Sequence, residues 1–197
     1  KENGGHTSAR LEAIKNAKCV VSDIKESERN VKPKAPFTTS KLQQSAATRL
    51  GFTSKKTMQI AQKLYEGVNI GSKRVGLITY MRTDSVRISD SALEDVRSWI
   101  GKNFPNDLPE KPVEYAVGKK AQDAHEAIRP TYTEYTPDYV KEFLSRDELR
   151  LYQLIWEAFV SSQMKGAKCL TTSVDIKADE ALFRVSSTKV TEKGFYN

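Results

Sequence analysis

The stretch GLITYMRTDS, residues 76–85, joins a short apolar run to a tyrosine and an arginine. The apolar residues predict a buried strand over residues 75–80, whose last residues emerge at a surface or a cleft. There Tyr80 would present a phenol, which serves as a nucleophile in several enzyme classes. Arg82 adds a permanent positive charge with a planar fork of donors that matches a phosphate group. The pair indicates attack on a phosphodiester, although the stretch alone also fits a buried tyrosine followed by a solvated turn.

A second stretch, AHEAIRP at residues 124–130, gathers side chains that handle protons and phosphates. Its His125 is one of two histidines in the chain and stands beside Glu126, and Arg129 follows four residues after the histidine. On a helix His125 and Arg129 would share a face. The alternative interpretation is a surface turn with an incidental charge pair.

Composition favours a globular protein with an anionic partner. The chain has 197 residues, of which 38% are hydrophobic and 29% charged, enough for one large domain or two small ones. Its 32 Lys and Arg residues exceed its 25 Asp and Glu residues and give a formal net charge of +7, which favours nucleic acid before an acidic protein or a membrane surface. No apolar stretch approaches the roughly 20 residues of a spanning helix, and the first residues lack a hydrophobic signal core. We therefore expect a soluble intracellular protein with no membrane partner.

The two cysteines, Cys19 and Cys169, stand near opposite ends of the chain. Two cysteines and two histidines without short ligand spacing argue against a zinc site. We expect two buried thiols, with a disulfide as the alternative. Both cysteines fall in β-like segments, so the two ends of the chain are expected to share a sheet.

Helix signals fill the middle of the chain. Each pairs a capping residue with an apolar stripe at helical spacing. The predicted helices begin at Ser40, Ser54, Ser89 or Ser91, Thr136-Pro137 (a short helix over 138–144) and Ser145 (a longer one to about Met164), with stops at Gly51, Gly67 and 101–105.

The two ends of the chain are β-like. Residues 19–24 predict a strand, residues 25–34 a charged extended connector, and 170–176 a strand followed by a hairpin turn at 178–180. We therefore predict an α+β fold in which a mainly helical domain, residues 36–165, is inserted into a discontinuous β-rich domain made of residues 1–35 and 166–197. The chain opens without an initiator methionine and stops after a strand-like segment, so we expect it to be a piece of a larger protein.

Three segments together resemble motifs of the type IA DNA topoisomerases, in that family's order. They are PFTTSKLQQSA at 36–46, LITYMRTDS at 77–85 and AHEAIRP at 124–130. Similarity between the first two motifs extends the resemblance over most of residues 36–165. Met81 and the sequence LQQ at 42–44 resemble bacterial topoisomerase I more than topoisomerase III, which usually has proline after the tyrosine.

The resemblance implies roles for individual residues. Tyr80 would be the nucleophile that cleaves single-stranded DNA and leaves a 5′-phosphotyrosyl bond, which conserves the energy for resealing without ATP. Arg82 would stabilise charge developing on the scissile phosphate. His125 would bond an acidic neighbour or the phosphate. Four further residues are implied to lie near the site without assigned steps: Thr83, Asp84, Glu126 and Arg129.

The family also implies parts that this sequence does not display. Its Toprim domain supplies a catalytic glutamate, a lysine and the carboxylates that hold Mg²⁺, and we find no Asp-x-Asp signature for it here. In this interpretation residues 1–35 and 166–197 are parts of a β-rich arch whose hinge lets the tyrosine domain lift and a second strand pass. We expect DNA, chiefly single-stranded, and the remaining domains of the same protein as partners, and a bacterial cytoplasmic location at the nucleoid. Alone, the chain is expected to fold, to bind no metal and to be inactive in relaxation, because a phenol with a reference pKa of about 10 needs the missing groups.

Two rival interpretations remain open. Tyrosine recombinases and type IB topoisomerases also form a phosphotyrosine, but their tyrosine follows a His-x-x-Arg pair, whereas Tyr80 precedes His125. The other rival is a non-catalytic basic module that binds DNA or a protein partner, with Tyr80 stacking on a base.

Overall fold

The computed structural model describes residues 3–116 and 125–197, and the chain divides into two compact units. One unit comprises Lys1–Val31 and Ala167–Lys193, and the other comprises Lys32–Gly166 and Gly194–Asn197. The mixture of helices and strands confirms the α+β prediction. No helix in the described ranges is long and apolar enough to cross a membrane.

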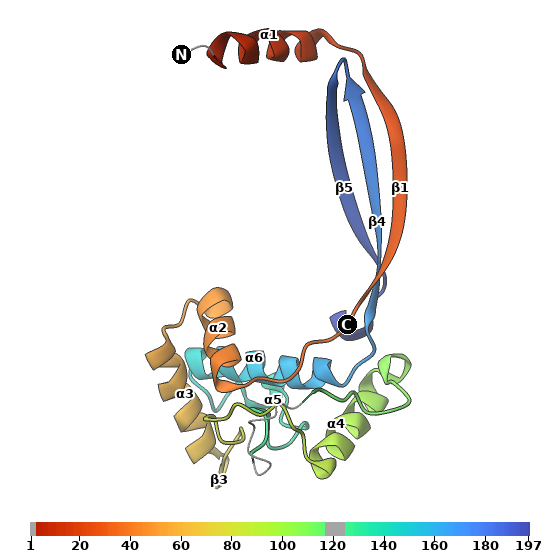
Figure 1. Cartoon of the computed structure of the whole chain (residues 1–197). Coiled ribbons are helices and arrows are strands. Elements are labelled where there is room, and N and C mark those ends of the chain that lie inside the picture. Colours follow the sequence, from red (N-terminus) through yellow and green to blue (C-terminus); the bar gives the residue numbers. More distant parts are fainter. Residues whose placement is uncertain (1–2, 117–124) are drawn as a thin grey trace. The chain divides into compact units, whose positions relative to one another are not determined.

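The first unit is a three-stranded antiparallel sheet preceded by a helix (Figure 1). Helix α1 spans Asn3–Asn16, and the sheet has the order β1-β4-β5, with β1 at Cys19–Val31, β4 at Ala167–Ala178 and β5 at Ala181–Glu192. A tight turn joins β4 to β5, and Asp179 within it adopts a positive φ of 53°, as such hairpin turns require. The predicted hairpin and the predicted sharing of a sheet by the two ends are confirmed.

The prediction of an extended connector over residues 25–34 is wrong over most of its length. Strand β1 continues to Val31, because β4 pairs with it as far as Ala167. Its many charged side chains point into solvent on an open sheet, where they cost little. Helix α1 and the length of β1 both escaped prediction, since neither segment has a hydrophobic face.

The expectation of two buried thiols holds for Cys169 only. Cys169 is buried and Cys19 is exposed, and both are free. Cys19 stands opposite Ala178 and Cys169 opposite Arg29, so the two thiols lie at opposite ends of the β1–β4 ladder. That separation excludes the alternative of a disulfide between them.

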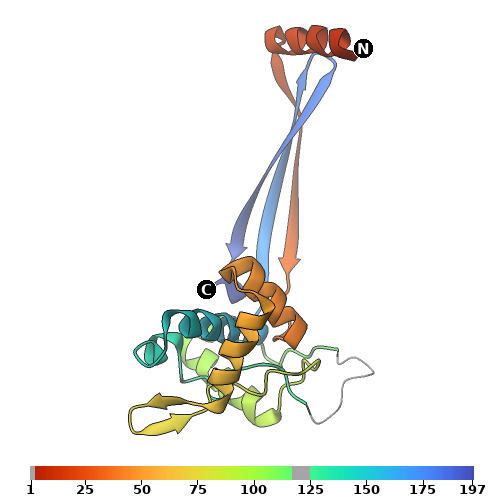
Figure 2. The same cartoon turned by 90° about the vertical axis from the view of Figure 1, so that its left-hand side faces the viewer.

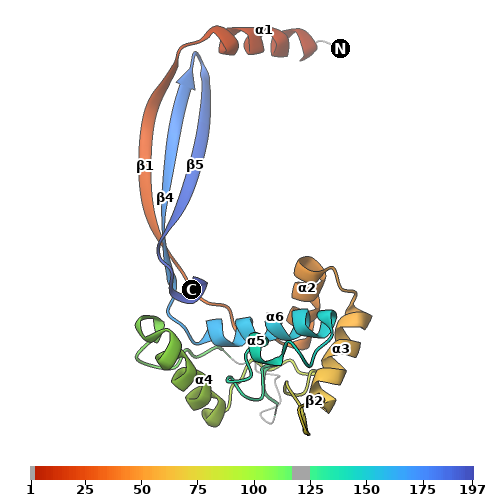
Figure 3. The same ribbon diagram turned by 180° about the vertical axis from the view of Figure 1, so that it is seen from behind.

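The second unit is built around one long helix, α6, at Arg146–Ser162 (Figure 3). Helices α2 (Thr39–Leu50) and α3 (Ser54–Glu66) pack on one part of it through the larger hydrophobic cluster, which includes fully buried Leu42, Leu64 and Ile155. Helix α4 (Asp90–Asn103) contributes to a second cluster that includes Val96, Ile100 and Phe159. The short helices are α5 (Pro137–Val140), η1 (Pro105–Asp107) and η2 (Gly194–Tyr196).

The helices begin and end at or within two residues of the capping residues that the sequence predicts. Thr38 and Thr53, rather than Ser40 and Ser54, cap α2 and α3, each accepting a bond from the amide three residues on. Gly51 ends α2 in the left-handed conformation at φ 71°. The capping box of Ser145 and Glu148 is present. The predicted helix over 138–144 ends as regular α-helix at Val140 and continues as a turn.

The prediction of a strand over residues 75–80 is wrong, because only Val75 at its start lies in a strand. A small hairpin, β2 (Val68–Ile70) with β3 (Lys73–Val75), was not predicted and ends where that strand should begin (Figure 2). Residues 76–85 are extended but irregular, with one isolated bridge between Ile78 and Pro130. Leu77 and Ile78 are fully buried, as in a strand. Residues 129–131 form backbone bonds to this segment through only the amides of Thr79 and Thr131, too few bonds for a regular strand ladder.

The hydroxyl of Tyr115 bonds to the first residues of the helical unit and to the end of α6, and its ionisation should make the unit less stable at alkaline pH. Its hydroxyl lies 2.9 Å from the carbonyl of Ser162 and 3.1 Å from that of Lys34. Burial raises the pKa of Tyr115 from 10.0 to about 12. The unfolded chain therefore ionises this phenol first, and the stability that Tyr115 contributes is present below about pH 10 and is lost as pH rises towards about 12. The difference in unfolding free energy between the wild type and Tyr115→Phe should shrink over that window in urea titrations, while a pH-independent difference would contradict the assignment.

Candidate functional site

The segment that carries Tyr80 is held by backbone bonds on both sides. The amide of Leu77 donates to the carbonyl of Leu64 at the end of α3 (2.8 Å), and the amide of Thr79 donates to the carbonyl of Arg129 (2.9 Å). Ile78 and Met81 are buried, so the backbone on either side of Tyr80 is anchored. The Tyr80 side chain is 46% exposed. The phenol is thus presented to solvent from a fixed backbone.

Two contacts near α3 set the position of this segment. The ring of Tyr80 meets the ring of Tyr65 edge to face, with centroids 5.3 Å apart. The backbone of Gly76 passes so close to α3 that a Cβ placed there would lie 2.7 Å from the carbonyl oxygen of Tyr65. A side chain at this position would push the last turn of α3 away from the tyrosine segment.

The turn after Tyr80 is bonded to the start of α2. The amide of Thr39 donates to the carbonyl of Thr83 (2.9 Å), and the hydroxyl of Thr39 donates to the carbonyl of Met81 (2.7 Å). The Thr83 amide donates to the Thr39 hydroxyl, and the Thr83 hydroxyl accepts from the amide of Ser85. Thr83 is buried, whereas Arg82 and Asp84 on either side of it are exposed. Thr83 therefore shapes the turn, and its exposed neighbours face solvent.

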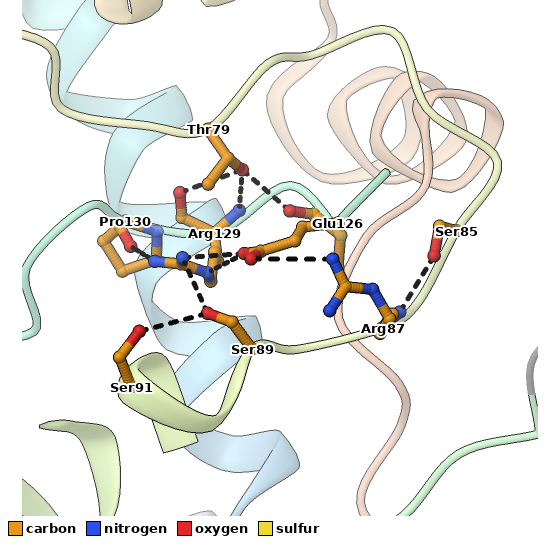
Figure 4. Close-up of polar contacts among 9 residues, drawn as sticks. Thr79, Ser85, Arg87, Ser89, Ser91, Glu126, Arg129 and Pro130 are labelled. Carbon is orange, nitrogen blue, oxygen red and sulfur yellow. Dashed lines mark hydrogen bonds and ion pairs between the residues drawn. The ribbon is translucent and has the colours of Figure 1, made fainter. Parts of the chain in front are cut away.

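Glu126 and Arg129 form a mostly buried ion pair, drawn in Figure 4. Nε and Nη2 of Arg129 lie 2.8 Å and 2.7 Å from the same oxygen of Glu126. Arg129 also donates to the carbonyl of Pro130 (3.0 Å) and reaches the hydroxyl of Ser89 (3.4 Å). A second arginine, Arg87, stands 3.9 Å from the other oxygen of Glu126. The two side chains of the pair are only 12% (Arg129) and 21% (Glu126) exposed, so this carboxylate orients an arginine rather than facing solvent.

Residues 125–130 are extended, so His125 and Arg129 do not share a helix face. The amide of Ala127 donates to the carbonyl of Arg87, and that of Ile128 donates to the carbonyl of Phe37, both at 2.8 Å. His125 is half-buried, and its imidazole makes no hydrogen bond or ion pair with any residue that the structure describes. Ala124, the first residue of this motif, lies outside the described residues.

The three motif segments found in the sequence meet in one backbone-bonded cluster. Residues 36–46 bond to 77–85 through Thr39 and to 124–130 through Phe37, and Thr79 bonds with its hydroxyl to the carbonyl of Ala127 (2.7 Å). Within the described ranges, no hydrogen bond, ion pair or ring contact joins the side chains of Tyr80, Arg82 and His125 to one another. The structure therefore unites the three segments that carry these residues.

Sequence reasoning missed two members of this cluster. Arg87 approaches Glu126. The side chain of Ser89, which was noted only as a helix cap, caps no backbone amide of α4 and instead approaches Arg129 and the hydroxyl of Ser91. Nothing in the sequence pattern marks Arg87. Ser89 stands directly before Asp90 and was recognisable as an N-cap, but its partner Arg129 is 40 residues away.

The cluster offers an exposed phenol and an exposed guanidinium. Among the described residues there is no group of three or more His, Cys, Asp or Glu side chains that could hold a metal ion. The chemistry available here is attack by a phenol on an anionic centre whose charge a neighbouring arginine can stabilise.

The family model and two similar proteins found by comparison all carry the description DNA topoisomerase. Residues 4–197 match the family described as DNA topoisomerase. The chain is 58% identical to DNA topoisomerase 1 of Treponema pallidum over 176 residues, covering 89% of this chain and 24% of that protein. It is 50% identical over 188 residues to DNA topoisomerase 1 of Campylobacter jejuni, covering 94% of this chain and 27% of that protein.

A similar solved structure is also that of a topoisomerase. The chain resembles full-length topoisomerase I from Thermotoga maritima with a TM-score of 0.80 and 38% identity, covering 95% of this chain and 30% of that one. The chain thus spans about a quarter of the length of the relatives that it matches.

Proposed function

Since the chain belongs to the DNA topoisomerase family, we propose that it supplies the nucleophile of a type IA enzyme that cleaves single-stranded DNA. The oxygen of Tyr80 attacks a backbone phosphorus, a phosphotyrosyl bond to the 5′ phosphate forms, and the 3′ oxygen leaves and takes up a proton. Attack by that 3′ hydroxyl reverses the step and reseals the strand. Passage of a second strand between the two events relaxes negative supercoils.

One observation carries this proposal: the exposed Tyr80 projects from the place where the three motif segments are bonded together. A structural tyrosine at the end of a buried run would be expected to pack inward or to bond through its hydroxyl. The hydroxyl of Tyr80 makes no hydrogen bond with the described part of the chain.

The neighbouring side chains divide into two groups in the proposed mechanism. In this proposal Arg82, which is exposed, and His125, which is half-buried, contact the scissile phosphate. Asp84 is exposed, two residues after Arg82, and has no assigned step. Thr83, Glu126 and Arg129 are engaged with the protein and act by holding the backbone of the site.

The complete enzyme in this proposal contains further domains, and it associates with chromosomal DNA in the bacterial cytoplasm. Mg²⁺ would be held by a Toprim domain, the part of the complete enzyme to which the family resemblance assigns the metal. The three-stranded sheet, in the region expected over residues 1–35 and 166–197, would be part of the β-rich arch. We call the chain together with these segments the full-length enzyme.

The 197-residue chain by itself is expected not to relax a supercoiled plasmid. Its phenol lacks the lysine, glutamate and metal ion that the Toprim domain would contribute. The measurement is agarose-gel mobility of negatively supercoiled plasmid after incubation with Mg²⁺. Relaxation by the purified chain would mean that residues within it complete the active site.

The polarity of the covalent product tests the reaction itself. Denaturing the full-length enzyme during cleavage of an oligonucleotide should leave the DNA on Tyr80 through its 5′ phosphate. An oligonucleotide labelled at its 3′ end then transfers its label to the protein, and one labelled at its 5′ end does not. The opposite pattern would indicate the chemistry of type IB enzymes and recombinases.

A further inference from the structure

A row of aromatic side chains stands on the surface of the helical unit and is not explained by the cleavage chemistry. The row consists of Tyr132, Tyr135, Tyr139 and Phe143, here called the aromatic row. Tyr135 lies in its middle, with ring centroids 5.5 Å from Tyr132 and 5.6 Å from Tyr139, and Phe143 lies 6.5 Å beyond Tyr139. Tyr132 and Tyr139 are each 53% exposed and Phe143 is 37% exposed. Three exposed rings around a half-buried fourth, Tyr135, are unusual for a surface with a purely structural role.

The aromatic row continues into a groove that approaches Tyr80. Tyr132 and Tyr135 line an open groove of about 690 Å³ together with Tyr65 and Arg74. Tyr65 is also the residue whose ring meets that of Tyr80. One aromatic side chain thus separates the groove from the proposed nucleophile.

The backbone beneath the aromatic row is held rigidly from inside. Thr133 is buried, and its amide and hydroxyl donate to one oxygen of Asp95 at 2.8 Å and 2.7 Å. The indole of Trp156 donates to the carbonyl of Thr133 (3.0 Å), and the hydroxyl of Tyr152 donates to the carbonyl of Tyr135 (2.6 Å). These bonds hold the backbone at Thr133 and Tyr135 in place before any ligand arrives, which lowers the entropy lost on binding.

The groove also carries a free positive charge. Arg74 is exposed and forms no ion pair within the described part of the chain, whereas Arg129, which also lines the groove, is engaged by Glu126. Exposed rings beside an arginine match single-stranded nucleic acid, because unpaired bases stack on the rings while the cation contacts their phosphates. Bases in a duplex are already stacked on each other and cannot lie flat on such rings.

We propose that the aromatic row and Arg74 form a binding subsite for single-stranded DNA, next to the phosphate that Tyr80 attacks and distinct from it. Bases stack on the exposed faces of Tyr132 and Tyr139, and Tyr135 supports both rings from between them. The identity of the ligand as DNA rests on the proposed function, whereas the stacking site rests on the rings themselves.

The test is binding of a fluorescein-labelled oligothymidylate of about 20 nucleotides to the 197-residue chain, measured by fluorescence anisotropy at low salt. Stacking contributes about 1–3 kcal/mol per base, so Tyr132→Ala/Tyr139→Ala should weaken binding by at least about tenfold. Tyr132→Phe/Tyr139→Phe should bind like the wild type, since stacking needs the ring and not the hydroxyl. Tyr196→Ala is the matched control, because Tyr196 is 52% exposed in the same unit but stands outside the row.

Charge is tested separately. Arg74→Ala should weaken binding and reduce the slope of log affinity against log salt by about 0.7, the value for one phosphate contact on a single strand. Circular dichroism confirms that each variant is folded. Binding by the double alanine variant within twofold of the wild type, or equal binding of duplex and single-stranded probes, would overturn the subsite.

Failure of the subsite can be told apart from failure of the proposed function. If the end-label experiment yields a 5′-linked covalent product but the double alanine variant binds normally, the function stands and the subsite is wrong. If no covalent product forms but the alanine variant loses binding, the subsite stands and the cleavage chemistry is wrong.

Discussion

Tyr80→Phe in the full-length enzyme is expected to abolish the covalent complex with DNA and to reduce relaxation by about 10⁴-fold or more, the scale seen when a catalytic nucleophile is removed. The ring is kept, so its edge-to-face contact with Tyr65 and the fold around it should remain. Binding of single-stranded DNA should change by less than about twofold, since stacking and phosphate contacts do not need the phenol oxygen. Denaturing gels of end-labelled DNA measure the covalent complex.

The control for this substitution is Tyr196→Phe, which removes a hydroxyl from another exposed tyrosine of the same unit. It should leave cleavage and relaxation at wild-type levels. A Tyr80→Phe enzyme that still accumulates covalent complex would show that another residue is the nucleophile, and the non-catalytic binding interpretation of this chain would then be favoured.

Glu126→Ala is expected to cost about 3–5 kcal/mol of unfolding free energy, because it leaves the buried guanidinium of Arg129 without its carboxylate. The loss should also loosen the tyrosine segment, since the carbonyl of Arg129 accepts the amide of Thr79. Urea unfolding followed by circular dichroism measures the change. In Glu126→Ala/Arg129→Met the uncompensated charge is gone, so much of the stability should return.

An exposed pair supplies the comparison. Lys141 and Asp138 lie 3.6 Å apart with side chains that are 55% and 95% exposed. Lys141→Ala should change stability by less than about 0.5 kcal/mol, as is usual for surface pairs. If Glu126→Ala costs no more than this control, the pair does not hold the site together.

Local signals in the sequence predicted much of the fold. The stop at Gly51, the capping box at Ser145 and the hairpin turn at Asp179 each depend on a few neighbouring residues, and all three are present. The wrong predictions share a different origin. Strand β1 extends to Val31 because β4 pairs with it along its length. The buried run at residues 76–80 is not a regular strand because residues 129–131 pair with it through only a few bonds. Pairing partners far away in the chain decide both outcomes, and periodicity carries no information about them.

In the candidate site, too, local features were predictable and long-range contacts were not. The segments that form the site were recognisable as sequence motifs, and the structure brings these segments together. Their connections were not recognisable, because Thr39 bonds to Met81 and Thr83 more than 40 residues away, and Arg87 reaches Glu126 from a loop without any sequence signature. The roles of Tyr80, Arg82 and His125 stay predictions until the variants are measured.

The close approach of Gly76 to the carbonyl of Tyr65 has a consequence for how this surface can evolve. Exposed positions such as Tyr132 or Tyr139 can be exchanged without disturbing any backbone, so the preference for bound bases is free to drift. Position 76 has no such freedom, because even a methyl group would separate α3 from the segment that presents the phenol. Divergent descendants of this chain that keep Tyr80 as a nucleophile should therefore keep glycine here, whatever happens to the groove beside it.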